Sequence, residues 1–201
     1  IVMVFIFAQV AIAWVYSHVL EYCLHRWLLH DRHKKYWFKT HMGDHHRAAK
    51  KNFMYDENFK KEVNIMTDPE VRGLILLAMI HSPVAALFPY AYLTLIICSY
   101  SYFYTHRKSH QDLRWARENA PWHYDHHLGK DQNVNWGVRL PIIDWLVGTR
   151  VKYKGTQIEE ERYNSLINKL RQINELRSHR NKRKRYKQSS PVVRGEPQSR
   201  D

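Results

Sequence analysis

The chain alternates long charge-free runs with short charged stretches, and the runs predict its main helices. Residues 1–20 contain no Asp, Glu, Lys or Arg. A helix needs about 20 apolar residues to cross the hydrocarbon core of a bilayer, so this run predicts a transmembrane helix. The run has neither the basic leader nor the small-residue cleavage site of a secretory signal. Because the chain opens on Ile1 rather than Met, we expect an incomplete N-terminus and an earlier membrane segment.

Residues 73–105 form a second charge-free run, with Pro83 and Pro89 near its middle. Proline breaks a straight helix, so the run predicts a helical hairpin that turns between Ser82 and Pro89. Each leg would have about 16 residues and span roughly 24 Å, which is short of the ~30 Å hydrocarbon core. Both ends of such a hairpin lie on the same face of the membrane, so segments before and after it can meet.

Ten of the fourteen histidines lie beside these runs in four clusters. The clusters are His25 and His30; His41, His45 and His46; His106 and His110; and His123, His126 and His127. Residues three or four apart share a face of an α-helix, whereas residues five apart, such as His25 and His30, are separated by about 140° and would straddle a site. Neutral imidazole is the commonest metal ligand, and ten imidazoles exceed the four that suit one tetrahedral ion. The clusters therefore predict two adjacent metal ions.

The charged stretches predict the orientation in the membrane. Residues 26–62 hold ten Lys or Arg, and Arg107 and Lys108 follow the second run directly. Basic residues accumulate on the cytoplasmic side of membrane proteins, so the histidine clusters should face the cytoplasm. We therefore expect an all-α integral membrane protein in which a cytoplasmic, histidine-rich helical cap holds a dinuclear metal site.

The length of 201 residues suits one main domain, which we place at residues 1–155, followed by a C-terminal segment at 156–201. Thr156 and Glu159 have the spacing of a capping box, and apolar residues at helical spacing predict an amphipathic helix from about 157 to 178. Arg177–Lys187 holds seven Lys or Arg, and we expect this basic tail to be disordered.

The tail contributes much of the formal net charge of +13. Such a tail either attracts anionic lipid or is merely solvated. A third interpretation of the tail, nucleic-acid binding, would leave the clustered histidines unexplained. The two cysteines, Cys23 and Cys98, form no Cys-x-x-Cys pair, so the sequence supports neither a disulfide framework nor a thiolate metal site.

Six short motifs follow one another between residues 21 and 150. They read EYCLHRWLLH (21–30), HMGDHH (41–46), THRKSH (105–110), WHYDHH (122–127), NVNWG (133–137) and DWLVGT (144–149). In this order they resemble the membrane fatty acid hydroxylase/sterol desaturase superfamily of non-haem di-iron enzymes. Acyl desaturases have similar histidine clusters, but only ten residues separate His30 from His41, as in the hydroxylase branch. Two departures are that Val147 stands where an aromatic residue is common, and that a single segment replaces the first hairpin of the family.

The resemblance implies O2-dependent hydroxylation, or a related C–H oxidation, of a membrane lipid such as a fatty acyl chain, a sterol or a carotenoid. It implies that all ten clustered histidines hold two iron ions, which zinc could replace in purified protein. The motifs include no cytochrome b5 domain, so we expect a separate electron donor, such as cytochrome b5, a ferredoxin or a reductase. The residues alone also allow a metal-binding or metal-transport protein without oxygenase activity. A carrier should place its ligands midway through the membrane, whereas these clusters flank the apolar runs.

Metal-bound histidines usually donate their other N–H to a carboxylate or a carbonyl. We expect Glu21 and Asp144 to accept such hydrogen bonds. His81 lies within an apolar run, where a bond to the backbone is the simplest role for it. Aromatic side chains next to the third cluster, Tyr102 and Phe103 among them, either belong to an aromatic belt at the membrane interface or line a lipid channel.

Overall fold

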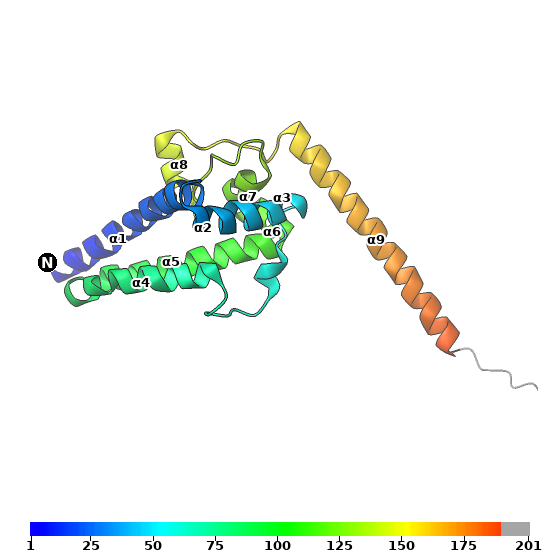
Figure 1. Cartoon of the computed structure of the whole chain (residues 1–201), viewed down its shortest axis with the longest axis horizontal. Coiled ribbons are helices and arrows are strands. Elements are labelled where there is room, and N and C mark those ends of the chain that lie inside the picture. Colours follow the sequence, from blue (N-terminus) through cyan, green and yellow to red (C-terminus); the bar gives the residue numbers. More distant parts are fainter. Residues whose placement is uncertain (190–201) are drawn as a thin grey trace, which may run out of the picture. The chain divides into compact units, whose positions relative to one another are not determined.

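The computed structural model describes residues 1–189, with side chains as far as residue 178 except that of Arg177. This described part is all helical and contains no strand, as predicted (Figure 1). The chain divides into two compact units, Ile1–Lys154 and Gly155–Asp201. The histidines of all four clusters belong to the first unit.

The first charge-free run forms helix α1, Val2–Leu24, which continues into a π-helix, η1, His25–Leu29. The predicted first helix is therefore confirmed, and it extends beyond residue 20. Together, Val2–Leu29 are long and apolar enough to cross a membrane. Large apolar side chains such as Val4 (73% exposed) and Ile12 (70%) point outward, as lipid-facing side chains do.

The second run forms the predicted hairpin, with helix α4, Pro69–Leu87, joined at Phe88 to helix α5, Pro89–Gln111. The predicted leg length was wrong. The legs have 19 and 23 residues, which correspond to about 28 and 34 Å at ~1.5 Å per residue. Both helices extend beyond the charge-free run into neighbouring residues that carry charge. At the start of α4, Asp68 caps the helix by accepting hydrogen bonds from the backbone N–H groups of Glu70 and Val71. Pro83 does not break α4, which is itself long and apolar enough to cross a membrane.

Short helices form a cap at the end of α1, α4 and α5 where the histidines lie (Figure 1). Helices α1 and α4 both pack against α5. A small apolar core formed by Met54, Ala116, Tyr124 and Leu128 holds the cap together. The cap elements are α2 (Lys35–Phe38), the π-helix η2 (Lys39–His46), α3 (Arg47–Lys51), the 3-10 helix η3 (Glu57–Lys60), α6 (Leu113–Asn119), α7 (Pro121–Leu128) and α8 (Ile142–Val147).

The second unit contains helix α9, Gln157–Ser189. The predicted N-cap is confirmed, because the backbone N–H of Glu159 donates to the hydroxyl of Thr156 at 3.3 Å. The predicted end near residue 178 was wrong, since the helix continues through the basic run. Lys and Arg are good helix formers, so charge alone does not end a helix. The expected disorder of the basic tail was wrong for the part that belongs to α9, which extends to Ser189, and residues 190–201 lie outside the described residues.

Candidate metal centre

All ten clustered histidines converge in the cap, and each is at most 9% exposed. Two groups have ring nitrogens within 4.8 Å of one another and could each hold a metal ion. The first group is His25, His30, His41, His46 and His126; the second group is His45, His106, His110 and His127. His123 lies outside both groups, with its Nε2 3.0 Å from Nε2 of His110. The hairpin thus brings together residues far apart in sequence, as the sequence predicted.

Two π-helices arrange the first two histidine clusters. In a π-helix the backbone bonds run between residues five apart, as between His30 N–H and the carbonyl of His25 at 3.2 Å. The rings of His25 and His30 consequently lie 5.0 Å apart, and those of His41 and His46 lie 4.7 Å apart. The expectation that His25 and His30 straddle the site was wrong, because it assumed 3.6 residues per turn.

The Nε2 atoms face one another across the centre. Nε2 of His41 lies 3.0 Å from that of His25 and 3.2 Å from that of His46, and Nε2 of His46 lies 3.1 Å from that of His126. Two ligands that each lie about 2.1 Å from one metal ion, at 90–110° to each other, are separated by about 3.0–3.4 Å. The spacing of the Nε2 atoms therefore fits ligands of a shared cation.

The loop that carries the NVNWG motif accepts hydrogen bonds from the Nδ1 atoms of two histidines in the first group. Nδ1 of His25 donates to the carbonyl of Trp136 at 2.6 Å, and Nδ1 of His126 donates to the carbonyl of Val134 at 2.7 Å. Asn135 lies between these two carbonyls in the left-handed region (φ 62°), which asparagine tolerates better than most residues. A hydrogen on Nδ1 leaves a lone pair on Nε2, directed into the centre.

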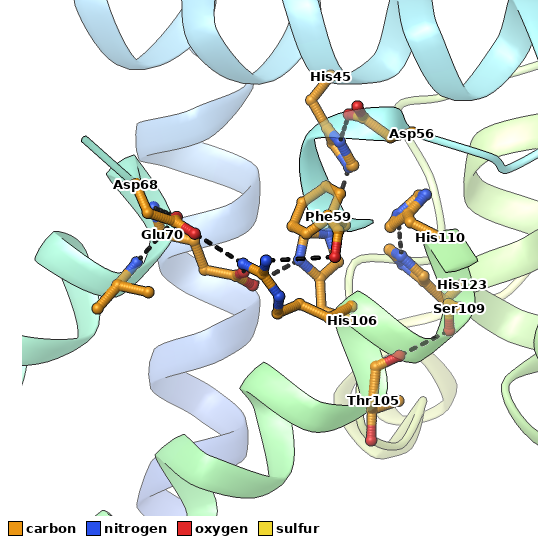
Figure 2. Close-up of polar contacts among 12 residues, drawn as sticks. His45, Asp56, Phe59, Asp68, Glu70, Thr105, His106, Ser109, His110 and His123 are labelled. Carbon is orange, nitrogen blue, oxygen red and sulfur yellow. Dashed lines mark hydrogen bonds and ion pairs between the residues drawn. The ribbon is translucent and has the colours of Figure 1, made fainter. Parts of the chain in front are cut away.

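Two carboxylates anchor the second group (Figure 2). Nδ1 of His45 donates to Asp56 at 3.1 Å, and Nδ1 of His106 donates to Glu70 at 2.6 Å. Their Nε2 atoms lie 3.3 Å apart. A third member, His110, donates from Nδ1 to the carbonyl of Met54 at 2.6 Å. Met54 has a positive φ of 70° and is fully buried, so its carbonyl is held in a backbone conformation that is unfavourable for this residue type.

A buried arginine, Arg107, holds the carboxylates beside His106. Arg107 donates to Asp68 at 2.7 Å and lies 3.7 Å from the second oxygen of Glu70. Its Nη2 also donates to the carbonyl of Phe59 at 3.3 Å. Arg107 therefore ties the start of α4 to the end of α5, and it orients the Glu70 carboxylate toward the histidine.

Burial keeps these imidazoles neutral. It is the largest cause that holds the pKa values of His41, His46 and His127 well below the ordinary 6.5, and repulsion between neighbouring imidazoles adds to the effect. The pKa of His123 is lowered in the same way. Burial raises the pKa of Asp56, but the hydrogen bonds from His45 and the backbone of Asn58 outweigh it, so the pKa lies below 3.8. Neutral rings beside an ionised carboxylate are the state that binds a cation.

The residues present fit a cation at this centre. Within the described part of the chain, both ring nitrogens of His127, Nδ1 of His46 and Nδ1 of His123 are buried without a hydrogen-bond partner. A buried polar atom without a partner is costly, and lone pairs of neighbouring Nε2 atoms repel one another. Metal ions bound between the rings would remove much of this cost.

The predicted role of Glu21 and Asp144 was wrong, because both bind backbone rather than a ring nitrogen. Asp144 accepts from the backbone N–H groups of Trp136 at 2.9 Å and Gly137 at 2.8 Å. A Cβ on Gly137 would clash with the backbone carbonyl oxygen of Leu140, so only glycine fits there. Glu21 accepts from the backbone of Arg139 at 3.0 Å and from its side chain at 2.6 Å. Both carboxylates thus support the loop whose carbonyls anchor His25 and His126.

Sequence reasoning missed the carboxylates that do contact histidines, Asp56 and Glu70. Glu70 lies 36 residues before its partner His106. The only local signal was that Glu70 stands in the first turn of a capped helix, and this does not identify a partner across the fold.

A cavity of about 610 Å³ extends from the histidines along α1, α4 and α5. At one end it reaches His25, His41, His45 and His106, and at the other it reaches His81 and Tyr92. Leucines and an isoleucine line much of the length between these ends, namely Leu20, Leu24, Leu74, Leu77, Leu95 and Ile96. Ligand cavities of roughly 300–1,000 Å³ hold small organic molecules. An apolar cavity that opens on two polar groups of histidines able to hold metal suits a lipid.

Of Tyr102 and Phe103, only Tyr102 lies where a residue that lines a lipid channel is expected. Tyr102 lines the cavity, and its ring stacks on His106 with centroids 5.5 Å apart. The ring of Phe103 instead packs against the guanidinium of Arg107 at 5.1 Å. His81 donates to the carbonyl of Leu77 at 2.8 Å, which confirms its expected backbone bond, and it also contacts the hydroxyl of Tyr16 at 2.9 Å.

An all-helical fold with two apolar helices long enough to cross a membrane, and with two buried groups of histidines able to hold metal, defines a histidine-rich helical membrane protein. The profile of the fatty acid hydroxylase family matches residues 10–149, well over half of the chain. The chain therefore belongs to this family, which lies in the membrane fatty acid hydroxylase/sterol desaturase superfamily of oxidoreductases. No curated protein and no solved structure gives a significant match.

Proposed function

We propose that this protein hydroxylates a membrane lipid with O2 at a di-iron centre held by the ten clustered histidines. The observation that carries the proposal is the position of the cavity, whose apolar walls lead to His25, His41, His45 and His106. A fatty acyl chain, a sterol or a carotenoid are the candidate substrates. Two iron ions, when bound, would supply the chemistry that activates O2 and oxidises a C–H bond.

The protein's own residues would prepare this centre in three ways. The backbone carbonyls of Trp136 and Val134 and the carboxylates of Asp56 and Glu70 fix which ring nitrogen carries hydrogen. Such outer hydrogen bonds also make the imidazole a better ligand. The leucine-lined wall of the cavity keeps water away from the bound chain and would position one of its carbons beside the centre.

Three further features belong to the proposal. The electrons would come from a separate donor, such as cytochrome b5, a ferredoxin or a reductase. The basic residues around the histidines favour a cytoplasmic location for the centre. The C-terminal segment would attract anionic lipid through its basic residues. Residues 1–155 would act as the membrane hydroxylase domain.

Isotope labelling tests the function directly. The iron-loaded protein in nanodiscs would be supplied with 18O2, a chemical or enzymatic electron source and an extract of membrane lipids, and the products analysed by mass spectrometry. We expect one 18O atom in a lipid product, and loss of this product in His126→Ala. The exposed His33 provides the matched control, because His33→Ala should retain the product. Bound metal without any O2-dependent product from fatty acyl, sterol and carotenoid lipids would favour a metal carrier instead.

A further inference from the structure

Helix α8 ends in three consecutive apolar residues that point away from the protein. Trp145 is 63% exposed, Leu146 78% and Val147 54%. Asp144, immediately before them, is fully buried and binds the loop at Trp136 and Gly137. The three exposed residues, which we call the α8 patch, take no part in the metal centre or in the lining of the cavity.

The α8 patch lies beside the histidine end of α1. Figure 1 shows α8 next to this end, and the two helices are in contact. The hydroxyl of Thr149, just after α8, lies 3.5 Å from the hydroxyl of Tyr22. The ring of Tyr22 also contacts that of Trp27, which is itself 59% exposed. A second outward-facing tryptophan therefore flanks the same tyrosine.

The position of Tyr22 along α1 sets the depth of the patch. Helix α1 starts at Val2 and presents exposed apolar side chains along most of its length. The charge-free run of α1 ends at Leu20, and Glu21 is the first charged residue after it. The part of the helix suited to hydrocarbon therefore ends next to Tyr22. The α8 patch therefore lies at the level where hydrocarbon gives way to headgroups.

The charges around the patch fit a lipid surface. Asp144 is the only carboxylate among residues 140–154, and it is buried, whereas Lys152 is exposed. Tryptophan favours the membrane–water interface, because its ring is apolar and its N–H is polar. Basic residues next to inserted apolar side chains strengthen binding to anionic lipid.

We propose that α8 is an interfacial membrane anchor, with Trp145, Leu146 and Val147 inserted among the lipids of the bilayer. Its opposite side holds the loop that anchors His25 and His126, through Asp144. The anchor thus seats the first group of histidines at a fixed height above the membrane. This inference is independent of the reaction that the centre performs.

Spin-label accessibility tests the anchor in the full chain. Leu146→Cys and, separately, Val147→Cys would be made in a Cys23→Ala, Cys98→Ala background that retains its metal, labelled with a nitroxide and reconstituted singly in nanodiscs of phosphatidylcholine and phosphatidylglycerol. Lys130→Cys, in an exposed polar turn, is the control in water. We expect both α8 labels to be accessible to O2 and several-fold less accessible than the control to a water-soluble nickel complex.

Two results would overturn the anchor. Nickel accessibility equal to that of the Lys130→Cys label would mean that the patch faces water. Protection of the α8 labels from both reagents would mean that protein, such as a second copy of the chain or an electron donor, covers the patch.

Discussion

The two groups of histidines are built from the same ligand type but are anchored differently. In the first group, His25 and His126 donate to backbone carbonyls of one loop. In the second group, His45 and His106 donate to the carboxylates of Asp56 and Glu70. The ionised carboxylate of Asp56 adds negative charge next to its histidine, and a backbone carbonyl does not. The second group should therefore hold a metal ion more tightly, and the first group should depend more on the conformation of its loop.

Removal of the Glu70 carboxylate should have the largest effect on the difference in metal affinity between the two groups. In Glu70→Ala we expect the affinity of the second group for Fe2+ to fall about 10–100-fold. Loss of a hydrogen-bond acceptor next to a metal-bound histidine has effects of this size. Titration of the metal-free protein with Fe2+ would show one weakened equivalent and one unchanged. The exposed Glu57 offers the matched control, Glu57→Ala. Equal weakening of both equivalents would abolish the distinction between the groups.

Removal of Asp144 should weaken the first group instead. Asp144→Ala leaves the backbone N–H groups of Trp136 and Gly137 without their acceptor, so the carbonyl that anchors His25 loses its position. Because this effect is indirect, we expect a loss near the lower end of the range, roughly tenfold, in the affinity of the first group. Glu118→Ala, exposed on α6, serves as the control. A loss confined to the second group would contradict the assignment.

Acid should destabilise the metal-free protein through both groups. The pKa values of His41, His46 and His127 lie well below 6.5 in the folded chain, because of burial and mutual repulsion. Below pH 6.5 the unfolded chain therefore binds more protons, and stability falls as the pH falls. One such histidine costs up to about 2 kcal/mol at pH 5. The apparent unfolding temperature in detergent with EDTA should drop between pH 7 and pH 5, and a constant or rising value would refute this linkage.

A bulky side chain in the cavity should change the substrate preference and leave the metal content of both histidine groups unchanged. Ile96 lines the cavity on α5, away from the histidines. In Ile96→Trp we expect the metal content to stay at the parent value while the turnover of longer or bulkier lipids falls several-fold relative to shorter ones. Competition between lipids of different length, followed by product analysis, measures this ratio. An unchanged ratio would mean that the substrate does not occupy this cavity.

The sequence predicted the arrangement of the main helices better than it predicted the local geometry of the metal centre. Charge-free runs located α1 and the α4–α5 hairpin, since transfer of apolar residues into lipid depends mainly on composition. The return of the hairpin then implied that four histidine clusters could meet, and in the structure they do. Composition did not reveal that α4 continues through Pro83, because whether a helix tolerates a proline depends on its surroundings in the fold.

The details of the centre depended on contacts that spacing does not encode. The π-helices at His25–Leu29 and Lys39–His46 place residues five apart side by side, and a pattern of 3.6 residues per turn excludes this. Glu21 and Asp144 are near histidines in sequence or motif, yet they support a loop. Asp56 and Glu70 reach His45 and His106 only because the chain folds back, so their roles required the structure.

If the chain holds two metal ions between its histidines, a count of bound metal per chain should find both of them. Full-length protein expressed in iron-rich medium would be purified in detergent and analysed by elemental mass spectrometry, alongside His110→Ala, His126→Ala and the control His33→Ala. We predict two metal ions per chain in the parent and the control, with at least one lost in each of the other two variants. One metal ion or none in the parent, or a content that is the same in all four proteins, would contradict the dinuclear centre.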